Sequence, residues 1–234
     1  MTVLAILQAR MSSRRLPGKV LAPVLGLPMI QRQIERIRFS ATIDRLVVAT
    51  SSMSGDDAIA ALCNKIDQPC FRGSLDDVLG RFVTALDRYG PADHVVRLTA
   101  DCPLIDWNVI DLCVREHIAS GADCTSNAII RTFPDGLDVE VIRSSALRAA
   151  AAAAQDRESR EHVTPFIYAH PETFRIRHVT QSEDLAKLRW TVDYPDDLAF
   201  VREVYALLYE RNPRFTSQDI LELPCGRRLA DTSA

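Results

Sequence analysis

The sequence lacks the features that mark membrane, secreted and zinc-binding proteins. Among its 234 residues no apolar run reaches about eighteen residues, the length that suggests a membrane-spanning helix. Six cysteines are present without a Cys-x-x-Cys pair, which argues against a zinc site and against a disulfide framework. No charged leader with a cleavage site precedes the first apolar run. The formal net charge of −3 disfavours general nucleic-acid binding. We therefore expect a cytoplasmic protein without a nucleic-acid or membrane partner.

Two common glycine-rich phosphate-binding motifs are also missing. Neither Gly-x-x-x-x-Gly-Lys-Ser/Thr nor Gly-x-Gly-x-x-Gly occurs anywhere in the chain. ATP hydrolysis of the P-loop type and dinucleotide binding are therefore not indicated.

Acidic residues are absent before Glu35, and this stretch contains a strongly basic loop. The loop at residues 8–21 follows the apolar residues 3–7, and its cations are Arg10, Arg14, Arg15 and Lys19. Exposed cations this close repel one another by roughly a few tenths of a kcal/mol per pair unless an anion compensates them. Ser12 and Ser13 add hydroxyl groups, and Gly18 follows a proline in a turn that can aim backbone N–H groups at a ligand. We interpret this segment as a phosphate-binding loop.

Short apolar runs alternate with amphipathic stretches in the first half of the chain. This alternation predicts βα units around a mostly parallel sheet. The expected strands lie at 3–7, 45–50, 69–71 and 93–98, and the expected helices at 29–38, 55–66 (with Ser54 as N-cap), 75–88 and 107–119 (with Asp106 as N-cap). After about residue 120 the pattern changes, with strands expected at 122–126, 137–142, 174–179 and 187–192, and helices at 144–155, 158–169 and 195–211.

Two aspartates follow apolar runs at positions where a strand would end. Asp101 follows residues 95–98, and Asp193 ends the run 188–192. Ligands in open α/β sheets bind beyond the carboxyl ends of the strands, so both are candidate catalytic carboxylates. Neither has a lysine four residues on that would make a simple helix-surface ion pair. The alternative is a turn or a helix cap, since Asp101 stands in an Asp-x-Pro sequence.

Other candidates carry structural alternatives of similar weight. Ser74 has the position of a helix N-cap, and Thr50 lies either on the rim of the site or in a plain polar loop. His162 is the best general acid or base among the five histidines, although a histidine at a helix end often only caps or packs.

Residues 135–140 bring three acids together, namely Asp135, Asp138 and Glu140. Half-buried strands often alternate polar and apolar side chains without any function. Three acids on one face are nevertheless unfavourable unless a cation, a metal or a hydroxyl-rich ligand meets them.

Five segments resemble a known family. Residues 8–19, which read Gln-Ala-Arg-Met-Ser-Ser-Arg-Arg-Leu-Pro-Gly-Lys, resemble the signature of the cytidylyltransferases that make CMP-activated acidic sugars, such as CMP-Kdo and CMP-sialic acid. The likeness is greatest to the branch called spore coat polysaccharide biosynthesis protein SpsF. It continues in order through residues 71–82, 97–106, 135–140 and 190–198.

The resemblance implies a fold and a division of the chain. It implies a three-layer α/β/α protein with a mostly parallel, Rossmann-like nucleotidyltransferase sheet of the GT-A-like kind and a small β/α acceptor-binding lobe. A single domain would cover residues 1–225, with a nucleotide-binding half at about 1–120, an acceptor and dimerisation lobe at about 121–190, and a return to the core at 191–225. Residues 226–234 are expected to form a flexible tail.

The resemblance also implies a reaction and a set of site residues. The reaction would be Mg²⁺-dependent transfer of CMP from CTP to a small acidic sugar or related acceptor, in a homodimer, for surface polysaccharide or glycoconjugate biosynthesis. The catalytic residues would be Arg10, Lys19, Asp101 and Asp193, and the two aspartates would hold Mg²⁺. The nucleotide-binding residues would be Ala9, Arg10, Ser12, Arg14, Arg15, Gly18, Lys19, Thr50, Arg72, Ser74, Asp77 and Arg81. The acceptor-binding residues would be Asp135, Asp138, Glu140, Glu161 and His162.

Two other functions are compatible with these residues. A glycosyltransferase would use a similar sheet, but such enzymes usually carry Asp-x-Asp after a central strand, where this chain has Asp101-Cys102-Pro103. A non-catalytic nucleotide-sugar-binding subunit would not need both aspartates and all the loop cations. Residues 128–190 do not match the acceptor-binding segments of the Kdo and sialic acid enzymes, so the acceptor stays open.

Overall fold

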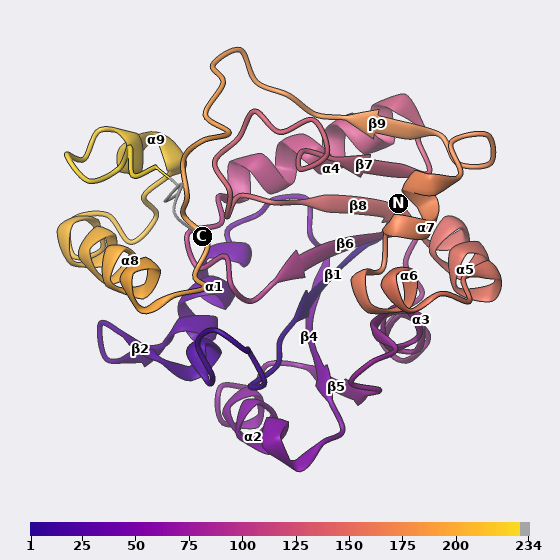
Figure 1. Cartoon of the computed structure of the whole chain (residues 1–234), viewed down its shortest axis with the longest axis horizontal. Coiled ribbons are helices and arrows are strands. Elements are labelled where there is room, and N and C mark those ends of the chain that lie inside the picture. The colour runs from indigo at the N-terminus through magenta and orange to yellow at the C-terminus, as the bar shows by residue number, and fades with distance from the viewer. Residues whose placement is uncertain (230–234) are drawn as a thin grey trace.

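The computed structural model describes residues 1–229, and its centre is a seven-stranded sheet (Figure 1). The strand order is β5-β4-β1-β6-β8-β7-β9. The strands are β1 (Val3–Gln8), β4 (Arg45–Ser51), β5 (Cys70–Gly73), β6 (His94–Thr99), β7 (Cys124–Ser126), β8 (Glu140–Arg143) and β9 (Ile176–His178). All neighbours pair in parallel except β8, which runs antiparallel to both β6 and β7. The predicted mostly parallel sheet is confirmed.

Strand β1 is almost entirely apolar because helices cover both faces of the sheet. The apolar side chains of Val3 to Leu7 alternate between two cores, with Ala5 and Leu7 in one and Leu4 and Ile6 in the other, and only the last residue, Gln8, is polar. A strand buried on both faces needs a continuous apolar run rather than alternation. The predicted three-layer arrangement is therefore confirmed.

Each face of the sheet has its own helices (Figure 1). The core that contains Leu7 takes side chains from α1 (Met29–Ile37), α2 (Asp57–Lys65), α4 (Trp107–Ser120), α8 (Pro195–Leu208) and α9 (Ser217–Leu221). The opposite face is covered by α3 (Val78–Tyr89), α5 (Ser144–Ala153) and α7 (Pro165–Ala169), with α6 (Arg157–His162) beside α3. Short elements η1 (Lys19–Leu21), β2 (Pro23–Val24), β3 (Leu27–Pro28) and η2 (Ser54–Asp56) complete the described chain.

Most helix ends agree with the expected ones. The Asp106 carboxylate caps α4 by accepting from the Asn108 N–H at 2.8 Å, as predicted. Ser54 is not an N-cap, because the one-turn helix η2 precedes α2 there. The single helix expected at 158–169 is two helices, α6 and α7, interrupted at Val163, whose φ is +74°.

Two expectations for the second half of the chain were wrong. Residues 187–192 form no strand and contribute only isolated bridges at Leu188 and Arg189. The expected tail is tied down at its start, since the Trp190 indole N–H donates to the Gly226 carbonyl at 3.0 Å. Arg228 also bonds the Asp197 carboxylate at 2.7 Å. Gly226 and Arg228 are therefore held against the rest of the protein, whereas Arg227 and Leu229 are exposed, and residues 230–234 lie outside the described residues.

The segment expected as the acceptor and dimerisation lobe, at about residues 121–190, extends the central sheet. Strands β7, β8 and β9 all come from residues 121–190 and continue the sheet beyond β6.

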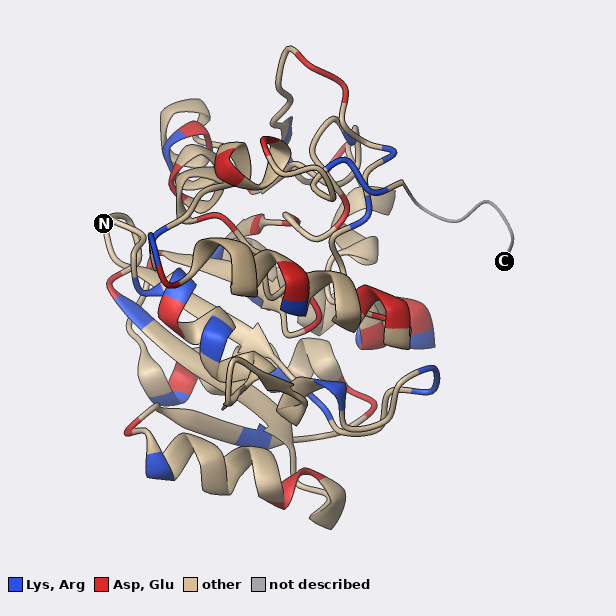
Figure 2. Cartoon of the chain, turned by 90° about the vertical axis from the view of Figure 1, so that its left-hand side faces the viewer, with Lys and Arg blue, Asp and Glu red and all other residues tan. Residues whose placement is uncertain are grey.

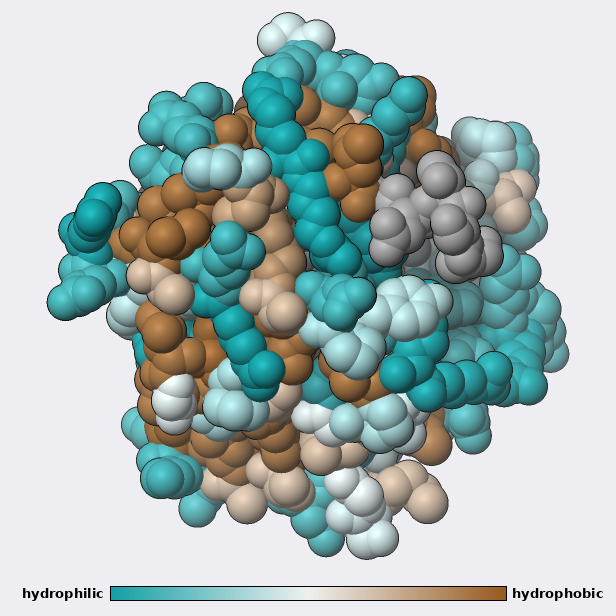
Figure 3. Space-filling model, turned by 60° about the vertical axis from the view of Figure 1, so that its left-hand side comes forward, coloured by the Kyte–Doolittle hydropathy of each residue, from teal (hydrophilic) through white to brown (hydrophobic). Residues whose placement is uncertain are grey.

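In the described part of the chain, no helix has the length and apolar character needed to cross a membrane. Large apolar side chains such as Ile129 and Ile130 are exposed, and Figure 3 shows apolar patches among polar residues on one face. The homodimer stays a prediction.

Candidate active site

A cavity of about 540 Å³ lies at the carboxyl ends of β1 and β6. The basic loop, the start of α3 and the end of α6 enclose it. The predicted site residues that line it are Ala9, Arg10, Arg14, Arg15, Lys19, Arg81, Asp101, Glu161, His162 and Asp193. Acidic and basic segments alternate over this side of the molecule (Figure 2), so the positive charge belongs to the cavity and not to a whole face.

The basic loop is held to the sheet by a residue that sequence reasoning missed. Asp56 accepts the Met11 N–H at 2.7 Å and the Ser51 N–H at 3.1 Å. Burial raises the pKa of Asp56, but these hydrogen bonds and that of the Ser51 hydroxyl bring it below its ordinary value. Gly18, at a φ of +74°, donates its N–H to the Met11 carbonyl and closes the turn at 2.9 Å. The loop is therefore fixed at both ends.

Lys19 connects the loop to both candidate carboxylates. Its ammonium lies 3.0 Å from Asp193 Oδ1 and 3.5 Å from Asp101 Oδ2, and it also donates to the Val192 carbonyl. The Lys19 side chain is only 8% exposed, so this ammonium depends on those oxygens for its solvation. The structure thus joins Lys19 of the loop, Asp101 after β6 and Asp193 before α8 in one ion-pair cluster, although Asp193 does not end a strand as was expected.

Asp193 is surrounded by positive charge. Arg15 and Arg189 each lie 2.9 Å from its carboxylate, in addition to Lys19. Burial raises the pKa of Asp193, but the three cations bring it below its ordinary value. The carboxylate is therefore ionised near neutral pH, and a metal ion that binds it must compete with these three cations.

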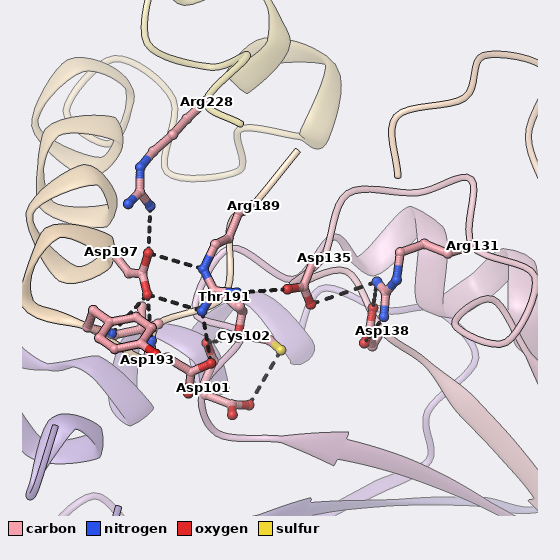
Figure 4. A network of polar contacts seen from close by, with 12 residues as sticks. Asp101, Cys102, Arg131, Asp135, Asp138, Arg189, Thr191, Asp193, Asp197 and Arg228 are labelled. Atoms are coloured by element: carbon pink, nitrogen blue, oxygen red, sulfur yellow. Dashed lines mark hydrogen bonds and ion pairs between the residues drawn. The ribbon is translucent and has the colours of Figure 1, made fainter. Parts of the chain in front are cut away.

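A second network, centred on Asp197, holds Asp193 in position through its backbone and through Arg189 (Figure 4). Asp197, which is 1% exposed, accepts the backbone N–H groups of Asp193 at 2.8 Å and Tyr194 at 2.9 Å. It also binds Arg189 and Arg228. Sequence reasoning missed Asp197, although an acid three residues past a helix N-cap is a known signal for such a contact.

The two aspartates suit a divalent cation that prefers oxygen ligands. Both carboxylates already contact one cationic group, the Lys19 ammonium. No set of three or more His, Cys, Asp or Glu side chains within residues 1–229 is arranged to hold a metal alone. A metal held here would need further oxygens from a substrate or from water.

The acids at 135–140 meet cations of the chain itself. Arg131 binds Asp138 at 2.8 Å, and Arg189 lies 3.4 Å from Asp135 (Figure 4). Neither acid lines the cavity. Glu140 is buried and binds Arg97, Thr164 and Tyr168 with its two oxygens. Glu140 does not line the cavity, and its carboxylate already binds three side chains, so its contact with an acceptor stays a prediction without geometric support here.

Several predicted nucleotide ligands lie outside the cavity lining. Arg72 donates to the Ser51 carbonyl at 3.0 Å and pairs with Asp57 at 2.7 Å. Ser74 accepts the Asp77 N–H at 3.0 Å, but it is not the N-cap of α3, so the capping alternative was wrong in its residue. The remaining ones are Ser12, which is exposed; Gly18, which closes the loop turn; Thr50, which is fully buried; and Asp77, which caps α3 at the Gly80 N–H.

His162 and Glu161 reach the cavity from the end of α6. His162 is exposed there, and Glu161 lies 3.8 Å from Arg10. Val163 follows in a strained γ-turn, with φ +74° and ψ −54°, closed by the Thr164 N–H on the His162 carbonyl at 2.9 Å. Such a conformation is rare for a β-branched residue and persists only where the surroundings hold it.

Three polar cavity residues were not predicted. Gln8, Arg97 and Thr99 come from β1 and β6, and all three line the cavity. Gln8 was placed in the basic loop, Arg97 in a buried strand and Thr99 just after it, and none was named as a site residue. The available signal was a charged or amide side chain inside an otherwise apolar run.

The site defines a class of protein before any comparison. A mostly parallel sheet whose carboxyl edge holds a basic loop and two carboxylates is typical of enzymes that bind nucleotides. A family model described as cytidylyltransferase matches residues 4–213, and the chain belongs to this cytidylyltransferase family. It is therefore a nucleotidyltransferase, which decides against the glycosyltransferase and the non-catalytic subunit.

Individual proteins support the same assignment. The spore coat polysaccharide biosynthesis protein SpsF of Bacillus subtilis (strain 168) is 33% identical over 228 residues, which cover 94% of this chain and 93% of that protein. A cytidylyltransferase structure from Leptospira borgpetersenii serovar Hardjo-bovis matches with a TM-score of 0.89 at 31% identity, covering 95% of this chain and 93% of that one. The CMP:2-keto-3-deoxy-manno-octonic acid synthetase complexed with CTP matches with a TM-score of 0.66 at 17% identity, covering 88% and 99%. That last likeness shows the fold alone.

Proposed function

We propose that the protein transfers CMP from CTP to a small acidic sugar or related acceptor, with Mg²⁺ bound, in surface polysaccharide or glycoconjugate biosynthesis. The observation that carries the proposal is the cluster of Lys19, Asp101 and Asp193 at the edge of a cavity lined by arginines. Membership of the cytidylyltransferase family supports the choice of CTP, and the resemblance to SpsF supports the acceptor class.

The reaction is a substitution at phosphorus. An acceptor hydroxyl oxygen forms a bond to the α-phosphorus of CTP, the bond from that phosphorus to its bridging oxygen breaks, and pyrophosphate leaves. The hydroxyl proton passes to a base or to water. Such transfers need alignment and charge neutralisation more than covalent participation by the protein.

The cavity offers the groups that this alignment needs. Arg10, Arg14 and Arg15 are exposed at the cavity and can bind triphosphate oxygens together with Lys19. Asp101 and Asp193 would hold Mg²⁺ against those oxygens, and the ion would supply neutralisation of the charge that develops on the phosphates.

The far end of the cavity suits a general base. His162 is exposed at its edge and has the side chain whose ordinary pKa lies nearest neutrality. Glu161 offsets the charge of Arg10 at 3.8 Å. We propose that His162 accepts the proton of the acceptor hydroxyl and that Glu161 lies beside the acceptor.

The test is pyrophosphate release. Purified protein is incubated with each nucleoside triphosphate, Mg²⁺ and a panel that includes 3-deoxy-manno-octulosonate and N-acetylneuraminate. We expect release with CTP and at least one acid, and none in the Asp101→Asn variant. The proposal is contradicted if no acceptor in the panel gives pyrophosphate release, or if neutral sugars give as much release as the acids.

A further inference from the structure

Arg97 is a charged side chain in the middle of the sheet, beneath the cavity. It stands on β6 between Val96 and Leu98, which are both buried, and its side chain is 15% exposed. Burying a guanidinium is unfavourable unless other groups compensate its charge and its hydrogen bonds. A strand that only had to fill a core would carry an apolar residue here.

Protein acceptors take up only some of the N–H donors of the Arg97 guanidinium. Nη1 binds Glu140, and Nε donates to the Gln8 side-chain oxygen at 3.1 Å. A guanidinium has five N–H donors. Within residues 1–229 Arg97 makes only these two side-chain hydrogen bonds, to Gln8 and to Glu140. Its Nη2 has no protein acceptor there. Since Arg97 lines the cavity, the remaining donors are available to a bound molecule.

Glu140 holds Arg97 rigidly in this orientation. One Glu140 oxygen binds Arg97, and the other accepts the hydroxyls of Thr164, at 2.9 Å, and Tyr168. Burial lowers the pKa of Arg97, but Glu140 and Asp101 more than offset this and keep the guanidinium charged. A fixed guanidinium loses little freedom when it binds a carboxylate, and its planar edge matches two carboxylate oxygens.

The position of Arg97 separates it from the triphosphate cations. Arg15 and Lys19 contact Asp193 at the basic loop, whereas Arg97 projects from β6 on the face covered by α3 and α6. Its closest cavity neighbours by hydrogen bonding come from β1 and β8 and not from the loop. It also lies near enough to Asp101 for that carboxylate to stabilise its charge.

We propose that Arg97 binds the acid group of the acceptor, with Glu140, Thr164 and Tyr168 as positioning residues that hold it in place. The proposal rests on the proposed function. It assigns acceptor specificity to the sheet itself: a carboxylate on Arg97 would place a neighbouring hydroxyl near Asp101, where the α-phosphorus is expected. It also explains why a glutamate with both oxygens occupied lies directly below the cavity.

The test separates acceptor binding from nucleotide binding. Protein saturated with Mg²⁺ and an unreactive α,β-methylene analogue of CTP is titrated calorimetrically with 3-deoxy-manno-octulosonate, N-acetylneuraminate and pyruvate. We expect wild type to bind at least one acid and Arg97→Gln to bind it about tenfold to a hundredfold more weakly, as for loss of a charged hydrogen bond. The affinity for the CTP analogue should stay within about twofold.

Three variants guard against a merely structural effect. Arg97→Gln leaves Glu140 buried without its cation, so Arg97→Gln/Glu140→Gln removes both charges and tests the same loss in a neutral core. Arg97→Lys should recover part of the acid affinity. Arg177→Gln is the matched control, because Arg177 on β9 pairs with Glu116 at 3.0 Å outside the cavity.

Each result has one meaning. If acid affinity is unchanged in Arg97→Gln and in the double variant, the assignment of Arg97 is overturned while the proposed function stands. If wild type binds the CTP analogue but no acid, the acidic acceptor of the proposed function is contradicted and the assignment of Arg97 falls with it. Equal weakening of acid and CTP analogue overturns it in favour of a phosphate-binding role. Failure of wild type to bind the CTP analogue contradicts the proposed function instead.

Discussion

Replacing Lys19 should change the affinities for metal and nucleotide in opposite directions. In the nucleotide-free protein the Lys19 ammonium contacts both Asp101 and Asp193. A divalent cation that binds these carboxylates must first displace it. The nucleotide phosphates attract the same ammonium, so CTP should free the carboxylates for the metal. Lys19→Gln removes this competition and one phosphate contact together.

The distances give the size of the effect. Coulomb's law with an effective dielectric constant of about 20 gives about 5 kcal/mol of attraction between Lys19 and each carboxylate, at 3.0 and 3.5 Å. Desolvation and water access reduce this, since Asp101 is 33% exposed, to a net of about 1 to 3 kcal/mol. Mn²⁺ affinity of the nucleotide-free variant should therefore rise about tenfold to a hundredfold. CTP affinity should fall by a similar factor, since a charged hydrogen bond is worth about 1.5 to 3 kcal/mol.

Free Mn²⁺, followed by electron paramagnetic resonance, measures the first affinity, and calorimetry with CTP measures the second. In wild type, CTP should raise the affinity for Mn²⁺, and Mn²⁺ should raise the affinity for CTP by the same factor. Lys19→Gln should lose most of this coupling. Lys65→Gln makes the same charge change on an exposed part of α2 and is the control. An unchanged or weaker Mn²⁺ affinity in nucleotide-free Lys19→Gln would refute the reasoning.

Three further predictions concern the site and the fold. Asp193→Asn should lower pyrophosphate release from CTP at least about a hundredfold while the melting temperature shows that the fold is kept; near-normal turnover would remove Asp193 from the site. Asp56→Asn should weaken CTP binding, because the Met11 N–H loses a carboxylate acceptor at 2.7 Å and the loop loosens, and calorimetry measures this. His117 is buried beside His94, and burial lowers the pKa of His117 to about 4. Because the unfolded chain binds this proton at higher pH, stability should fall by up to about 1.4 kcal/mol per pH unit from about pH 6.5 down to about pH 4. Urea denaturation should show this slope in wild type and a smaller one in His117→Gln.

The sheet and the basic loop could be predicted because local sequence decides them. Residues 3–7 are apolar without interruption, as a doubly covered parallel strand requires, and all are buried in β1. The loop cations had to collect around an anion or around carboxylates, and Lys19 meets both predicted aspartates. The segment 187–192 alternates like a strand, yet it reaches Asp135 and the C-terminal residues through single bridges, a tertiary arrangement that no local pattern encodes.

The acids at 135–140 show that an electrostatic argument can require a cation without saying which group supplies it. Three neighbouring carboxylates do require cations, and the structure supplies them, but as arginines of the chain itself. The partner of Glu140 is Arg97, which lies 43 residues earlier in the sequence and is brought opposite by the antiparallel pairing of β6 with β8. That register pairs Arg97 with Glu140 on adjacent strands, so the charge that sequence analysis sought in an acceptor is met across the sheet. The unused N–H donors of the guanidinium are the reason we propose the arginine, and not the acid, as the residue that contacts the acceptor.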